Sequence, residues 1–342
     1  MWNDDSPTYI RPATRALTSI NLTMCSPQLY LSYSWEVEED QWGIDHFPFI
    51  LKGHFDPSQN YTDTFQRIKA RKERQPLNFH SHNDEEYNKL STIEELKTAL
   101  KKSHDTTPCP DEIHYQILKH LPDLALENLF SIFNHIWESG DFPSSWKEAM
   151  IIPIPKPGKD DTNANNYRPI ALTSCVCKTM ERMINERLIW YIETAAMITI
   201  FQSGFRKTRS TIDHLVRLET FIREGFIKQE HVVSIFFDLE KAYDTTWKYG
   251  ILSDLHQMGL RGRLPIFIDN FLSDRCFRVR VGTSLSDSFD QEQGVLQGSI
   301  LSVTLFIIKI NTIVSCVFVL VQIAPYLLMI LTFVIGLRIW HQ

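Results

Sequence analysis

The chain has 342 residues, of which 43% are hydrophobic and 22% are charged. This composition is that of a globular protein, so a wholly disordered chain is excluded, and the length allows two domains. The formal net charge of −6 argues mildly against a protein whose whole surface binds nucleic acid. Charge is local, however, because residues 146–217 hold 11 Lys and Arg against 7 Asp and Glu. A basic face that contacts phosphates therefore remains compatible with the sequence.

The six cysteines form no C-x-x-C pair, which argues against a metal knuckle. They are interpreted as reduced thiols of an intracellular protein in the nucleus or cytoplasm. Asp4 and Asp5 follow the first residues at once, so no signal peptide is expected at the start of this sequence.

Residues 1–52 alternate short apolar runs with turn residues, a pattern typical of β-structure. They include Asp45 and His46, and a carboxylate beside an imidazole can form a general-base pair. Residues 53–90 are polar and lack apolar periodicity, so they are predicted to be a solvated linker.

Order is expected to resume at Ser91, where Thr92 and Glu95 offer a capping box for a helix over residues 93–100. Two further helices are predicted from apolar stripes over residues 113–121 and 126–137. These stripes indicate core positions.

A short apolar strand over residues 150–155 runs into a loop that carries Lys156 and Lys159. A second apolar stretch begins at Tyr167 and contains Arg168. Two basic segments beside short strands could form a clamp for a triphosphate, or an exposed hairpin with ordinary surface charges. A helix over residues 178–188 follows.

The apolar run Val232 to Phe237 is β-branched and aromatic, which predicts a strand buried on both faces, and it ends at Asp238. A carboxylate at the end of a buried strand is costly unless a positive group meets it, and Mg²⁺ would be such a partner. The alternative is that Asp238 caps the next helix and that Lys241 is solvated.

Amphipathic helices are predicted over residues 250–258 and 264–271, and a half-buried strand over residues 277–281. Gly294 to Ser299, with the sequence GVLQGS, precedes a long apolar helix. Glycines at this place would let the backbone approach a ligand closely.

Five blocks, VVSIFFDLEKAYD, PIPKPGK, NYRPIAL, FQSGFRK and GVLQGS, together resemble the reverse transcriptases of non-LTR, jockey-like retrotransposons. The resemblance implies that Asp238 is catalytic and binds Mg²⁺, and that Tyr243 excludes the ribose 2′-hydroxyl. It implies nucleotide contacts for Lys156 or Lys159, Arg168, Gln297 and Gly298, and template contacts for Gln202, Gly204, Phe205 and Arg206. The implied partners are an RNA template, a DNA primer and dNTPs. Leu296 departs from the proline that is usual in the GVLQGS block.

Residues 1–52 resemble the end of the endonuclease domain of the same elements, with Asp45 and His46 at matching positions. Ile44 stands where the family has Ser, and Asn21 where it usually has a metal-binding Asp. The segment is therefore interpreted as a remnant that is too short to bury the sheets of a sandwich domain.

The third palm motif of the family, which supplies another metal-binding aspartate, is not found, because no Asp or Glu follows Glu292. Residues 310–337 instead carry no charge, and about 20 apolar residues can span a bilayer, so hydropathy alone predicts a C-terminal transmembrane helix. A second interpretation comes from the genetic code. Starting with Ala324 and reading from the third base of each codon, the possible codons permit S-L-F-A-D-D-F. We therefore expect a frameshift after about Cys316.

The predicted fold class is α+β: an incomplete right-hand polymerase with fingers and most of the palm but no thumb, after a β-rich endonuclease remnant. The predicted segments are the remnant (1–52), the linker (53–90), the fingers and palm (91–316) and an apolar tail (317–342). The predicted function is RNA-directed DNA synthesis, with little or no activity of the chain as written. The alternatives are a non-enzymatic nucleic-acid-binding remnant and a protein anchored in a membrane by residues 310–337.

Overall fold

The computed structural model describes the chain in separate stretches that form two compact units. The described residues are 9–10, 17–18, 33–37, 49–53, 69–73, 75–107, 111–229, 232–236, 241–321 and 328–332. Before residue 54, and over 232–236, 312–321 and 328–332, the description covers the backbone alone. One unit comprises Met1–Pro76 with Val233–Phe236 and Met329–Thr332, and the other holds the remainder of the chain.

The first unit contains paired strands in the part that is described. β1 (Tyr9–Ile10) pairs with β2 (Leu17–Thr18), and β3 (Tyr33–Val37) pairs antiparallel with β4 (Phe49–Gly53). β7 (Val232–Phe236) pairs with β11 (Leu328–Thr332). The strand predicted before Asp238 is thus confirmed as β7. Asp45, His46 and Asp238 lie outside the described residues.

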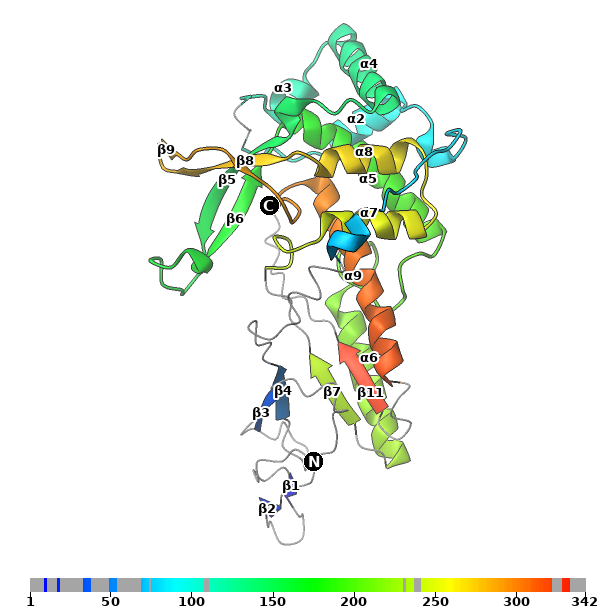
Figure 1. Cartoon of the computed structure of the whole chain (residues 1–342), viewed down its shortest axis with the longest axis vertical. Coiled ribbons are helices and arrows are strands. Elements are labelled where there is room, and N and C mark those ends of the chain that lie inside the picture. The colour runs from blue at the N-terminus through cyan, green and yellow to red at the C-terminus, as the bar shows by residue number, and fades with distance from the viewer. Residues whose placement is uncertain are drawn as a thin grey trace. The chain divides into compact units, whose positions relative to one another are not determined.

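The second unit holds a mixed sheet with the strand order β10-β8-β5-β6, and β9 pairs with β8. Figure 1 labels β5, β6, β8 and β9 of this sheet. Its strands are β5 (Glu148–Pro155), β6 (Tyr167–Leu172), β8 (Cys276–Val281), β9 (Ser284–Leu285) and β10 (Phe289–Asp290). β5 and β6 form an antiparallel hairpin in which Ile154 faces Arg168, whereas β5 and β8 run parallel. The parallel pair brings residues more than a hundred positions apart into one sheet.

Helices make up the remainder of this unit and confirm the predicted α+β class. They are α2 (Ile93–Lys101), α3 (Tyr115–Lys119), α4 (Asp123–Ser139), α5 (Cys175–Thr194), α6 (Thr211–Lys228), α7 (Lys248–Gln257), α8 (Arg263–Leu272) and α9 (Ile300–Val321). The capping box predicted at the start of α2 is present, because the Thr92 side chain accepts from the backbone N–H of Glu95 and the Glu95 carboxylate accepts from Thr92 N–H.

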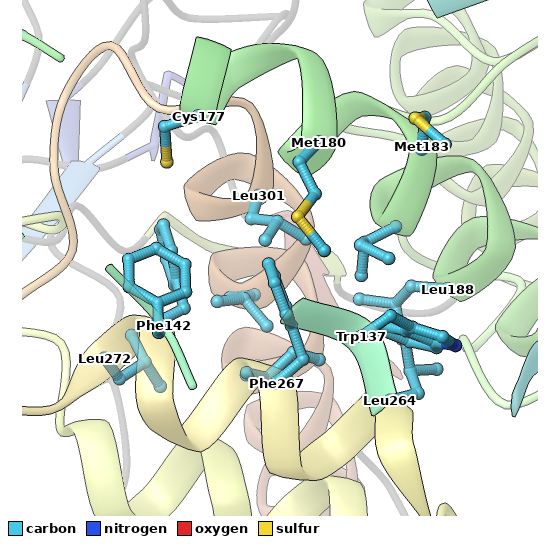
Figure 2. Close-up of a cluster of buried hydrophobic side chains, with 14 of the residues drawn as sticks. Trp137, Phe142, Cys177, Met180, Met183, Leu188, Leu264, Phe267, Leu272 and Leu301 are labelled. Carbon is cyan, nitrogen blue, oxygen red and sulfur yellow. The ribbon is translucent and has the colours of Figure 1, made fainter. Parts of the chain in front are cut away.

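The core lies where α4, α5, α8 and α9 meet, as Figure 2 shows with Trp137, Met180, Phe267 and Leu301. Phe142 packs in this core, with ring centroids 5.6 Å from Trp146 and 5.5 Å from Phe267 in edge-to-face arrangements. Truncating one such buried aromatic residue to alanine costs about 3–5 kcal/mol in a typical core. This core is the rigid support on which the site is built.

The second half of the predicted linker packs against this core. Phe79, Tyr87 and Asn88 are buried. The Asn88 amide donates to Arg261 O (2.8 Å), and its Oδ1 accepts from Leu264 N (2.9 Å) near the start of α8. A polar side chain is buried here because it satisfies backbone groups at the end of a helix. Composition alone does not reveal that role.

Within the part of the chain that the structure describes, no helix combines the length and apolar character needed to cross a membrane. Residues 322–327 and 333–337 of the uncharged segment 310–337 lie outside that part.

Candidate active site

The tip of the β5–β6 hairpin holds the basic residues predicted to contact a triphosphate. The Lys156 backbone N–H donates to Asn166 O (2.8 Å), and its ammonium group donates to Asn165 O (2.8 Å). Lys159 is exposed in the same loop, and Arg168 is half-buried on β6. The hairpin therefore carries all three predicted cations on one short piece of structure.

A second segment, the turn of residues 241–246, reaches the hairpin tip from far along the sequence. The Lys241 ammonium group donates to Asn165 Oδ1 (3.0 Å), so Lys156 and Lys241 both bond to the same asparagine. Lys241 has a left-handed backbone, with φ of +49°. Such a conformation is uncommon for a residue with a long side chain and is held by its surroundings.

A third segment, the GVLQGS block, lies against the turn of residues 241–246. Gly294 N donates to Thr246 O (2.9 Å) and Val295 N donates to Tyr243 O (2.8 Å). The Gln297 amide donates to the Asp244 carboxylate at 3.3 Å. Desolvation raises the pKa of Asp244, although the hydrogen bond from Gln297 and the charges of Lys241 and Lys156 act in the opposite direction.

Gly298 sits in contact with β6. Its φ is +128°, and a Cβ atom at this position would lie 2.4 Å from the carbonyl oxygen of Ala171. On the neighbouring residue, Gln297 O accepts from Ala171 N at 2.7 Å. The turn can approach the strand this closely only because residue 298 has no side chain.

Tyr243 is buried and its ring stacks on Phe306 of α9, with centroids 5.0 Å apart and planes 21° apart. Burial raises the pKa of its hydroxyl to about 12. The residue thus has a packing role in the core beside any role in contacting a sugar. Sugar selection by Tyr243 stays a prediction.

The four predicted template residues lie on one loop that meets α9 further along the helix. Gln202 is buried and donates to Ile307 O at 3.4 Å. Gly204 is exposed, and Phe205 has a left-handed backbone with φ of +58°. α9 begins directly after the GVLQGS block, so one helix links this block with the loop that carries the four residues.

The Arg206 guanidinium donates its hydrogen bonds to other groups of the protein. Its Nε and Nη2 donate to the Glu193 carboxylate at 2.8 and 2.6 Å, and its Nη1 donates to Thr199 O and Gln202 O at 2.9 and 3.0 Å. This geometry makes Arg206 the residue that holds the loop, and its contact with a template stays a prediction.

Glu193→Gln is expected to destabilise the protein at neutral pH by about 1 kcal/mol, since the pair with Arg206 is partly exposed. The hydrogen bond from Arg206 holds the pKa of Glu193 below its ordinary value of 4.5. A lowered carboxyl pKa contributes stability above the unfolded value and loses it as the pH falls through the folded value. The cost of the substitution, measured by urea unfolding, should therefore shrink below about pH 4. If Glu193→Gln cost the same free energy at neutral pH and at acidic pH, the stabilising pair of Glu193 with Arg206 would be contradicted.

Sequence reasoning did not select Lys241, Asn165 or Asp244 as site residues, and the structure adds them by contact. It also passed over Glu181 in α5. A signal for Glu181 was present, because it shares a helical stripe with Cys177, Ile184 and Leu188, all of which are buried. A charged residue inside a buried stripe needs polar partners, which directs attention to what it touches.

Residues 154–319 match the family described as reverse transcriptase (RNA-dependent DNA polymerase). The match includes every residue from Lys156 to Gly298 that was predicted to serve the polymerase. Known relatives come from non-LTR retrotransposons, as the sequence blocks indicated.

The chain is 35% identical over 216 residues to the RNA-directed DNA polymerase from mobile element jockey of Drosophila melanogaster. It is 34% identical over 215 residues to the probable RNA-directed DNA polymerase from transposon BS of the same species. The retrovirus-related Pol polyprotein from type-1 retrotransposable element R2 of Popillia japonica is 30% identical over 218 residues. Each of the first two similarities covers 63% of this chain and 24% of the relative, so the chain spans about a quarter of their length.

Proposed function

We propose that residues 91–316 form the fingers and most of the palm of an RNA-directed DNA polymerase of a non-LTR retrotransposon. The observation that carries the proposal is the convergence of three distant segments, namely the hairpin tip at Lys156, the turn at Tyr243 and the turn at Gln297. Each lies in a block that resembles a polymerase motif, and the reverse transcriptase match covers them all.

The reaction of such a polymerase is attack of a primer 3′-hydroxyl on the α-phosphate of a dNTP, with pyrophosphate as the leaving group. Lys156, Lys159 and Arg168 would hold phosphates by charge-assisted hydrogen bonds. Gln297 and Gly298 would position the nascent base pair, and Tyr243 would select deoxyribose.

Mg²⁺ is proposed from the resemblance, with Asp238 as its ligand. Among the residues that the structure describes, no three His, Cys, Asp or Glu side chains gather so that they could hold an ion. Asp244 is the described carboxylate next to the Gln297 turn, and it accepts a hydrogen bond from Gln297. When bound, the ion would stabilise charge on the attacking and leaving oxygens.

The chain as written is proposed to synthesise little or no DNA. The two-metal mechanism requires more than one carboxylate, and no Asp or Glu follows Glu292. The match to the reverse transcriptase family ends at residue 319, close to Cys316, where the reading frame is predicted to shift. Both observations support a tail that arises from a frameshift. The endonuclease remnant and the intracellular location stay predictions from the sequence.

The binding of a labelled RNA-template–DNA-primer duplex tests the proposed function. We expect the logarithm of the affinity to fall linearly with the logarithm of the salt concentration, as counterions are released from the phosphates. Lys156→Gln and Arg168→Gln should leave this slope unchanged and should each weaken binding of the complementary dNTP to the duplex complex, because each removes one contact with the triphosphate. Lys97→Gln is the control, since Lys97 is an exposed cation on α2 whose partner is Glu94. Binding without salt dependence, or an equal effect of Lys97→Gln, would contradict the proposal.

The same assay separates the polymerase site from a non-enzymatic nucleic-acid-binding remnant. A nucleotide site formed by Lys156, Arg168 and Gln297 should bind the dNTP that pairs with the next template base. That dNTP should tighten the duplex complex, and a mismatched dNTP should not. A remnant that binds nucleic acid alone would show salt dependence with no effect of either dNTP.

A further inference from the structure

Glu181 is a fully buried carboxylate in the middle of α5, with 0% of its surface exposed. Its Oε2 accepts from Ser299 Oγ at 2.5 Å, from Ile300 N at 2.9 Å and from Leu301 N at 3.4 Å. Its Oε1 accepts from the Cys177 thiol at 3.4 Å. Three of the four donors thus belong to the end of the GVLQGS block and the first turn of α9, more than a hundred residues away in sequence.

The surroundings of Glu181 explain how a charge is tolerated there. A buried carboxylate is costly unless several donors meet it, and the first N–H groups of a helix lack partners within that helix. The N-terminal end of α9 also carries partial positive charge. Burial and the nearby Glu181 raise the pKa of the Cys177 thiol well above its usual range, so the thiol keeps its proton and donates it. The Arg275 guanidinium, also buried, adds a favourable charge interaction with Glu181.

The Gln297–Gly298 turn is therefore held from two sides. On one side Ala171 of β6 donates to Gln297 O and leaves no room for a side chain at Gly298. On the other side Glu181 bonds to Ser299 and to the two residues that follow it. Because Ser299 follows Gly298 directly, any loss of the Glu181 contacts releases the turn at its C-terminal end.

We propose that Glu181 is the positioning residue of the Gln297–Gly298 turn: it holds the turn in place before a nucleotide binds and does not touch the nucleotide itself. The inference deepens the proposed function, because it depends on this turn being part of the nucleotide site. It also gives a reason why a carboxylate, and not an apolar side chain, lies at position 181 in the core. Well-packed apolar residues are often as stabilising as buried ionic groups.

The first measurement follows backbone amide hydrogen exchange in a peptide that spans residues 294–305 of the free protein. Glu181→Leu removes the acceptor of the Ile300 and Leu301 amides and should speed their exchange about tenfold or more. Glu181→Gln retains one acceptor oxygen for the amides and should leave their exchange close to that of the unaltered protein. Rescue by this conservative variant is what separates capping of α9 from a requirement for the charge.

The matched controls are Asp254→Leu and Asp254→Asn. Asp254 is also a buried carboxylate, on α7, and it pairs with Lys309 of α9 at 2.8 Å. These variants disturb the packing of α9 on a neighbouring helix away from the Gln297 turn. They should lower the melting temperature without speeding exchange of the Ile300 and Leu301 amides. Equal exchange at these residues in Glu181→Leu and Asp254→Leu would overturn the inference.

The second measurement is the tightening of the primer–template complex by the complementary dNTP. Glu181→Leu should lose most of this tightening while it binds the duplex alone with unchanged affinity, and Glu181→Gln should keep it. Full tightening in Glu181→Leu would overturn the inference.

If the unaltered chain binds no duplex, the proposed function fails, and hydrogen exchange alone decides the role of Glu181. If Glu181→Leu does not fold, Ser299→Ala, which removes one donor, should produce the same changes in smaller measure, and no change there would overturn the inference.

Discussion

Replacing Gly298 by alanine is expected to lower the melting temperature by roughly 6–12 °C, which corresponds to about 3 kcal/mol of unfolding free energy in a unit of this size. The added Cβ atom would lie 2.4 Å from Ala171 O, and a backbone oxygen in a sheet cannot move aside as a flexible side chain can. The φ of +128° adds strain, because residues with side chains rarely adopt it. Thermal unfolding followed by circular dichroism measures the effect.

Two other glycines provide matched controls for Gly298→Ala. Gly282 has a φ of +59° with nothing near its missing side chain, so Gly282→Ala tests backbone strain alone and should cost about 1 kcal/mol. Gly204 has neither a positive φ nor a close neighbour, so Gly204→Ala should change stability by less than about 0.5 kcal/mol. If Gly298→Ala were as mild as Gly282→Ala, the close approach of the GVLQGS block to β6 would be refuted.

The purified chain is expected to extend an oligo-dT primer on poly-rA at least about a thousandfold more slowly than a reverse transcriptase with a complete set of metal-binding aspartates. The reason is that a catalytic metal contributes several kcal/mol to the transition state, and about 4 kcal/mol is a factor of a thousand in rate. Incorporation of labelled dTTP with Mg²⁺ measures this. Robust synthesis that disappears in Asp238→Ala would refute the proposed inactivity and would leave the polymerase assignment intact.

The nucleotide sequence that encodes residues 316–342 decides the cause of the missing motif. A frameshift predicts that the shifted frame reads Ala-Asp-Asp or Val-Asp-Asp near the codons of residues 327–331. If neither appears, the frameshift hypothesis is wrong, and the uncharged segment requires another explanation. If the motif is found, a version of the gene with the reading frame restored should regain primer extension, because it encodes the second aspartate.

Local patterns in the sequence were enough to predict many of the described elements. The α2 capping box and the strand β8 in the second unit, and the strand β7 in the first, all follow from signals within a few residues. α3 is shorter than predicted, at Tyr115–Lys119, because an apolar stripe marks a buried face and does not mark where a helix stops. The polymerase motifs were also legible, since each is a contiguous block.

The sequence by itself thus determined the protein class, the candidate residues and the absence of a carboxylate after Glu292. Only the tertiary structure decided which of those residues meet. It placed Lys241 and Lys156 on Asn165, buried Asn88 at the start of α8, and set Glu181 under the Gln297 turn. The physical reason is that hydrophobic periodicity shows which face of a helix or strand is buried, but it does not show which other element covers that face. A hydrogen bond between residues a hundred positions apart depends on how helices and strands pack, which no local pattern encodes.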